Sequence, residues 1–125
     1  MLAAIIAAVF AFLGLLHFYW ALAGVGDANH AAIPQINGVP VFKPSKAATA
    51  GVGVLLLVTA AIVLMRVDLL VAGAAAVMVL RAIGDFRLVG FFKRVRDSRF
   101  ARMDTLVYSP LCLALGAALA VLAAS

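Results

Sequence analysis

Residues 47–80 decide the fold, and they read AATAGVGVLLLVTAAIVLM (47–65), RVD (66–68) and LLVAGAAAVMVL (69–80). A helix needs about 20 mostly apolar residues to cross about 30 Å of hydrocarbon, because each residue adds about 1.5 Å. Two apolar runs separated by so short a polar segment predict a tight antiparallel pair of membrane-spanning helices.

Two further apolar runs lie outside this pair, at residues 2–23 and 105–124. Together the four runs predict an all-α fold, a four-transmembrane-helix bundle that forms a single domain over residues 1–125. The expected helices span approximately residues 2–24, 46–65, 69–92 and 104–124. Ser45 and Asp104 are the expected N-caps of the second and fourth helices, and Pro110 is expected to bend the fourth.

The composition agrees with a membrane protein. Hydrophobic residues make up 67% of the chain, whereas soluble proteins are about 45–50% apolar. Ten Lys and Arg against five acidic residues give a net charge of +5. Because the basic residues lie mostly between apolar runs, we expect them to meet the membrane surface and expect no nucleic acid. The single cysteine, Cys112, excludes an internal disulfide.

Four crossings place both termini on one side of the membrane. The other side carries a long Pro- and Gly-containing loop between the first two helices and the basic loop 93–102. Only Arg66 is basic on the side of the termini. The positive-inside rule therefore predicts cytoplasmic long loops and outward termini. Loop 93–102 is read as a topology signal or as a site for anionic lipids or a partner. We expect the first loop to lie against the bundle mouth as a lid.

Polar residues of three helices are expected to lie at one depth. His17, Asp85 and Tyr108 all fall about 24 Å from the outer surface when helix rise is counted. Arg81 belongs in the membrane as well, because residues 69–80 alone are too short to span it. Arg81 and Asp85 are four residues apart on one helix face, so we expect them to pair. His17 and Trp20 are three residues apart and share one face of the first helix.

This layer defines the candidate ligand-binding residues, which are His17, Trp20, Arg81, Asp85, Asp104, Tyr108 and Ser109. Each has a structural alternative: an ion pair that locks the third helix, a hydrogen-bonded core histidine, or a cap with an interfacial tyrosine. No spacing typical of a metal site, a nucleotide loop or a Ser/His/Asp nucleophile is present, so we expect no metal and no cofactor. Gly51-Val52-Gly53 is interpreted as a helix-packing feature.

Several segments resemble a bacterial family of small four-helix membrane proteins that is catalogued only as a domain of unknown function. They are His17-Phe18-Tyr19-Trp20-Ala21, Gly38-Val39-Pro40 with Phe42 and Pro44, Arg81-Ala82-Ile83-Gly84-Asp85-Phe86-Arg87, and Asp104 with Tyr108-Ser109-Pro110-Leu111-Cys112. The resemblance covers nearly the whole chain. It implies the four-span fold and a multi-pass location in the bacterial inner (plasma) membrane, and it supplies no activity.

Three functional hypotheses follow. The first is a non-enzymatic protein that binds a small amphipathic ligand or a lipid head-group in an inner-leaflet polar pocket, or that serves as an accessory subunit of a membrane complex. The second is a membrane enzyme or redox accessory acting on a lipid or quinone-like substrate, in which Arg81 holds an anion and His17, Asp85 or Tyr108 moves a proton. The third is proton-coupled transport by a homo-oligomer.

Overall fold

The computed structural model describes residues 1–23, 32–37, 39–42 and 45–125, and most of them are helical. The elements are α1 (Leu2–Ala23), β1 (Gln35–Ile36), β2 (Val39–Pro40), α2 (Lys46–Met65), α3 (Asp68–Ile83), α4 (Arg99–Met103), the π-helix η2 (Asp104–Tyr108) and α5 (Ser109–Ala124). The last three form one continuous helical segment. The two short strands pair as an antiparallel hairpin between α1 and α2.

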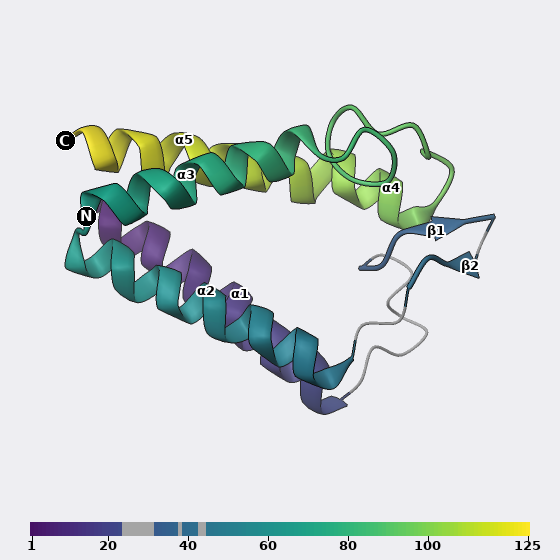
Figure 1. Ribbon diagram of the computed structural model, residues 1–125, viewed down its shortest axis with the longest axis horizontal. Coiled ribbons are helices and arrows are strands. Elements are labelled where there is room, and N and C mark those ends of the chain that lie inside the picture. Colours follow the sequence, from purple (N-terminus) through teal and green to yellow (C-terminus); the bar gives the residue numbers. More distant parts are fainter. Residues whose placement is uncertain (24–31, 38, 43–44) are drawn as a thin grey trace.

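The helices are arranged as two pairs that are joined at one end (Figure 1). Helix α1 lies along α2, and α3 lies along α5. The pairs meet at the end that carries both termini and the α2–α3 turn, and they diverge toward the end that carries the β-hairpin and α4. We call these the closed end and the open end.

A hydrophobic core at the closed end holds all four helices together. Its buried members are Ile6, Ala7 and Phe10 of α1, Ala60 and Val63 of α2, Val71 and Ala75 of α3, and Leu115, Leu119 and Leu122 of α5. The same end is tied by Arg66, which has left-handed backbone angles and caps α2. Its guanidinium donates to the Ser125 hydroxyl at 3.0 Å, which links the α2–α3 turn to the C-terminus.

Within the described residues, three helical segments are long and apolar enough to cross a membrane, and they indicate a membrane protein. They span Leu2–Ala23, Lys46–Met65 and Arg99–Ala124, with 22, 20 and 26 residues. Helix α3 is shorter than these three segments, with 16 residues. It therefore rises only about 24 Å. The bounds predicted for the second helix, 46–65, are confirmed, and the Ser45 hydroxyl accepts the Ala48 N–H as its N-cap. The first helix is described to Ala23, so its predicted end at residue 24 lies outside the described residues.

The prediction that the third helix extends to Phe92 was wrong. It ends at Ile83, where the chain turns back on itself through two glycines with positive φ, Gly84 and Gly90. A Cβ on Gly84 would lie 1.9 Å from the carbonyl oxygen of Val89. The backbones therefore approach so closely that only glycine fits, and the apolar residues that follow belong to a folded loop, not to a longer helix.

The helix predicted for residues 104–124 begins earlier in the structure, at Arg99, and the segment from α4 to α5 is its observed counterpart. Its N-cap is Ser98, whose hydroxyl accepts the Ala101 N–H at 3.0 Å, and not Asp104. Before Pro110 the helix widens into the π-turn Asp104–Tyr108, in which the N–H of Ser109 bonds to the carbonyl of Asp104. The sequence predicted a bend at Pro110. What the structure shows there is a π-helical turn that ends two residues before the proline.

Candidate functional site

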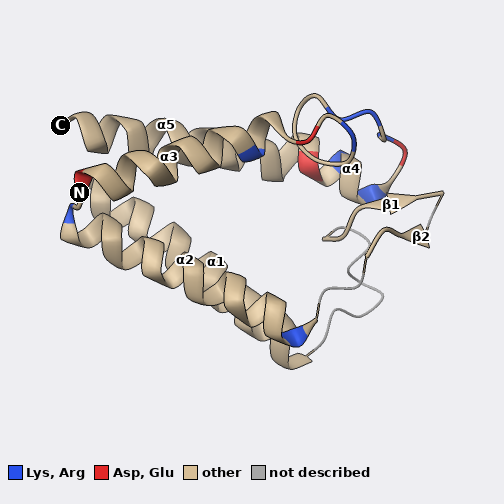
Figure 2. Cartoon of the chain, viewed as in Figure 1, with Lys and Arg blue, Asp and Glu red and all other residues tan. Residues whose placement is uncertain are grey.

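Most of the predicted polar residues lie at or beside two separate sites on the two helix pairs. One is a pocket beside α1 and α2, and the other is a charged cluster between α3 and the start of the helical segment from α4 to α5. Both lie toward the open end, where most of the basic residues of the described chain gather (Figure 2). Among the described residues, the lining of the pocket contains His17 and Trp20 and none of the other candidates.

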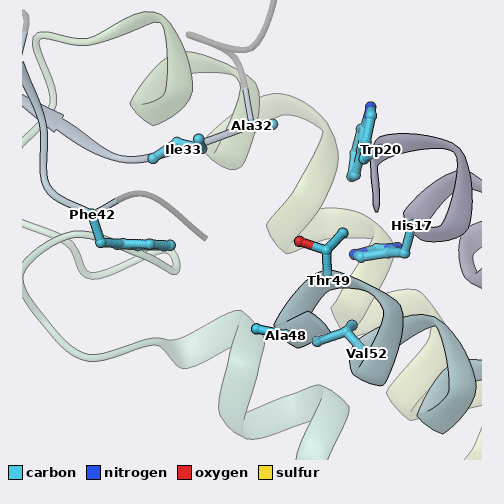
Figure 3. A pocket seen from close by; sticks show the side chains of 8 residues that line it. All are labelled: His17, Trp20, Ala32, Ile33, Phe42, Ala48, Thr49 and Val52. Atoms are coloured by element: carbon cyan, nitrogen blue, oxygen red, sulfur yellow. The ribbon is translucent and has the colours of Figure 1, made fainter. Parts of the chain in front are cut away.

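The pocket has a volume of about 340 Å³. His17 and Trp20 of α1 form one wall, and residues of α2 and of the segment before it form the others (Figure 3). The remaining lining residues are Ala32, Ile33, Phe42, Ala48, Thr49 and Val52. Three described residues of the first loop, Ala32, Ile33 and Phe42, therefore line one side of this pocket.

A close contact between two glycines sets the geometry of the pocket. A Cβ on Gly14 would lie 3.0 Å from the carbonyl oxygen of Gly53, and a Cβ on Gly53 would lie 3.0 Å from the carbonyl oxygen of Gly14. The backbones of α1 and α2 thus touch at this level. The pocket residues His17 and Thr49 lie about one helical turn further toward the open end.

His17 is held by its own helix and by Trp20. Its Nδ1 lies 2.7 Å from the carbonyl oxygen of Leu13. The imidazole and indole rings meet edge to face, with their centroids 5.1 Å apart and an interplanar angle of 68°. These contacts orient the imidazole within the pocket wall, so the sequence correctly placed these two side chains together.

Thr49 is a pocket residue that the sequence analysis missed. Its side chain points into the pocket beside His17 (Figure 3), and the residue is only 7% exposed. The hydroxyl donates to the carbonyl of Ser45 at 2.9 Å. A threonine within the first turn of an apolar helix is common, so its position alone carried no signal.

Asp104 is the centre of the charged cluster. It is fully buried, and its carboxylate accepts from Arg81 Nη2 at 2.8 Å and from the backbone N–H of Gly90 at 2.7 Å. Lys93 Nζ lies 3.2 Å from the same carboxylate. One buried anion therefore joins α3, the loop that follows it and the helical segment from α4 to α5.

The predicted pairing of Arg81 with Asp85 was wrong. It requires a helix that continues through Asp85, but α3 ends at Ile83. Asp85 is exposed, and its carboxylate instead accepts three backbone N–H groups, from Arg87, Leu88 and Val89, at 2.8–3.2 Å. These bonds, that of Leu88 foremost, hold the pKa of Asp85 below its usual value. Asp85 closes the turn and contacts neither Arg81 nor the pocket.

Lys93 also differs from its expected role as a basic loop residue. Its side chain is fully buried, and its ammonium donates to the carbonyl of Gly90 at 3.0 Å and to the Thr105 hydroxyl. The cluster thus contains two cations for one carboxylate. This role could not be recognised in the sequence, because Lys93 stands at the start of a basic segment whose arginines are exposed.

Tyr108 and Ser109 lie beside the cluster. The ring of Tyr108 packs against Phe100, with centroids 5.8 Å apart. Ser109 is completely buried, and its hydroxyl has no hydrogen-bond partner within the described residues. Neither residue lines the pocket of His17.

A second hollow of about 570 Å³ lies where the β-hairpin meets the loop before α4. It is lined by Ile36 and Asn37 on one side and by residues 94–97 on the other. Arg94 and Arg96 are exposed there, and the Arg96 guanidinium donates to the carbonyl of Phe91 at 2.7 Å. The first loop therefore reaches from the α1–α2 pair to the basic loop of the other pair.

Comparison with known families shows which family the chain belongs to. The model of a family described as protein of unknown function, DUF3995, matches residues 10–119. The chain belongs to this family. The part that matches DUF3995 contains both the pocket and the charged cluster. No curated protein and no solved structure is significantly similar to the chain.

Proposed function

We propose that this protein crosses the bacterial inner membrane four times and binds a small amphipathic molecule in the pocket of His17 and Thr49. The pocket itself is the observation that supports this proposal most directly. Its volume of about 340 Å³ falls within the range of small-molecule sites, and its mostly apolar walls with a few polar groups are typical of them.

The course of the chain supports a fourth crossing by α3. Helix α2 ends at the closed end, and the fourth span begins at the open end, so the chain must return across the membrane between residues 65 and 99 (Figure 1). Helix α3 lies in this interval and runs along α5. Its rise of about 24 Å covers most of about 30 Å of hydrocarbon.

The distribution of charge supports a cytoplasmic open end. Arg94, Arg96, Arg99 and Arg102 lie there, whereas Arg66 lies at the closed end (Figure 2). The positive-inside rule then places both termini outside. The hollow beside Arg94 and Arg96 is the position at which we propose that anionic lipid head-groups bind, since guanidinium groups pair well with phosphate.

We favour binding over catalysis for a geometric reason. An enzyme of the kind considered above would need Arg81 and His17 to act on one substrate. Arg81 is bound to Asp104, and it is not among the residues that line the pocket of His17. A binding role needs only the pocket.

Filling the pocket tests the proposal. Ala48 lines the pocket and its neighbour Ala47 does not, so Ala48→Phe should obstruct the site while Ala47→Phe adds the same ring elsewhere. Wild type and both variants would be purified in mild detergent, and the co-purifying small molecules would be extracted and identified by mass spectrometry. We expect a molecule that is retained by wild type and Ala47→Phe and lost from Ala48→Phe. Equal extracts from all three proteins would refute a ligand at this pocket.

A further inference from the structure

Two polar side chains of the pocket, those of His17 and Thr49, direct their donor groups at backbone carbonyls of the protein. We infer that the pocket takes an apolar molecule that carries a hydroxyl donor, an alcohol or a phenol, in preference to an ether, a ketone or a quinone. This inference rests on the proposed function, since it names the class of ligand for the same pocket.

The hydrogen bond of His17 fixes its tautomer. Its Nδ1 lies 2.7 Å from the Leu13 carbonyl oxygen, and a carbonyl can only accept, so Nδ1 carries the proton. In the neutral imidazole the other nitrogen, Nε2, then has a lone pair and no proton. Among the described residues, no acidic side chain lines the pocket. Toward a ligand, His17 therefore acts as an acceptor.

Thr49 presents the same chemistry. A hydroxyl has one proton to donate and two lone pairs, and the proton of Thr49 is directed at the Ser45 carbonyl, 2.9 Å away. The side chain is buried in the pocket wall, so its remaining hydrogen-bonding capacity is that of an acceptor.

The described donors on the α1 and α2 sides of the pocket are bound within the protein or turned away from Thr49. The backbone N–H groups of Ala48 and Thr49 are bound to the hydroxyl and the carbonyl of Ser45, each at 3.0 Å. The indole nitrogen of Trp20 lies at the end of its ring that is turned away from Thr49 (Figure 3). A ligand that reaches His17 and Thr49 with an acceptor oxygen would leave that oxygen unpaired, which weakens its binding.

A matched pair of probes tests the need for a donor. We would use 4-nonylphenol and its methyl ether, 4-nonylanisole, which share the apolar body and differ in the donor. Binding to the purified protein in detergent is read from the fluorescence of Trp20, the single tryptophan of the chain. We expect the phenol to bind about five- to tenfold more tightly than the ether, because one hydrogen bond contributes about 1 kcal/mol.

Variants assign this preference to the two acceptors. The double substitution His17→Phe with Thr49→Val keeps the shape of the wall and removes both acceptors, so the ratio of the two affinities should fall to about one. Thr59→Val is the matched control: Thr59 also donates to a backbone carbonyl of α2, that of Leu55 at 2.8 Å, but it does not line the pocket. Comparing ratios within each protein removes the partitioning of the probes into detergent.

The outcomes separate the inference from the proposal on which it rests. Saturable binding of both probes to wild type with equal affinity, or tighter binding of the ether, overturns the donor requirement and leaves the pocket as a binding site. A preference for the phenol that persists in the double variant also overturns it. Saturable binding of neither probe overturns the pocket proposal itself, and the inference with it.

Discussion

The guanidinium of Arg81 lies 2.8 Å from the carboxylate of Asp104, which ties the end of α3 to the π-helical turn η2 before α5. The same carboxylate holds the loop after α3 through the N–H of Gly90 and through Lys93. This single buried anion therefore organises the α3–α5 side of the open end.

Replacing Asp104 by asparagine should lower the free energy of unfolding by about 3–5 kcal/mol, because two cations would lose their anion and one of them is fully buried. Unfolding by denaturant in detergent micelles measures the change. Asp97→Asn is the control, since Asp97 is exposed and lies outside the cluster. Lys93→Met should cost less than Asp104→Asn, because Asp104 would keep Arg81 and Gly90. A variant Asp104→Asn as stable as Asp97→Asn would contradict this role.

Gly53→Ala should destabilise the α1–α2 pair by about 1–3 kcal/mol, because added atoms in a well-packed contact force the backbones apart. The new Cβ would lie 3.0 Å from the carbonyl oxygen of Gly14. Gly51→Ala is a close control on the same helix, since nothing lies within 4 Å of its Cβ. Thermal unfolding of both variants checks the prediction, and equal melting temperatures would refute the close contact.

Asp85 should make stability depend on pH on the acid side. The N–H groups of Leu88 and its neighbours lower the pKa of the folded carboxyl below the usual 3.8. The stabilisation is thus complete above about pH 4 and is lost as the pH falls through the lowered pKa. Melting temperatures of wild type and Asp85→Asn should differ most near neutral pH and converge in acid. A difference that grows toward acid would show the opposite sign of the shift.

The crossing by α3 can be tested with single cysteines. In a Cys112→Ala background, Val67→Cys marks the α2–α3 turn and Asp97→Cys marks the loop before α4; both positions are exposed. We expect an impermeant maleimide to label Val67→Cys in right-side-out vesicles and Asp97→Cys in inverted ones. Labelling of both cysteines from the same side would contradict a fourth crossing.

The spans could be predicted from the sequence because long apolar runs leave a helix few alternatives in lipid. The bounds of α2 and its cap at Ser45 followed from composition and capping alone. The loop after α3 could not be predicted, because its residues 88–92 are as apolar as a membrane-spanning helix. What ends the helix is a backbone contact between Gly84 and Gly90, which depends on tertiary structure.

The candidate site was predicted in part. Spacing along α1 correctly joined His17 and Trp20, but counting depth says only how far along a helix a residue lies, not which neighbour it faces. Arg81 was therefore assigned to Asp85 on its own helix, whereas its partner is on another. Lys93 and Thr49 were missed because burial of a polar side chain is decided by the segments that cover it.

The central claim is that the pocket of His17 and Thr49 holds a small molecule, and native mass spectrometry of the protein released from lipid nanodiscs tests it most directly. We predict a complex of one chain with one small molecule for wild type and for Ala47→Phe, and the bare chain for Ala48→Phe. Observation of the bare chain for all three proteins, or of the same bound mass in Ala48→Phe, would contradict the claim.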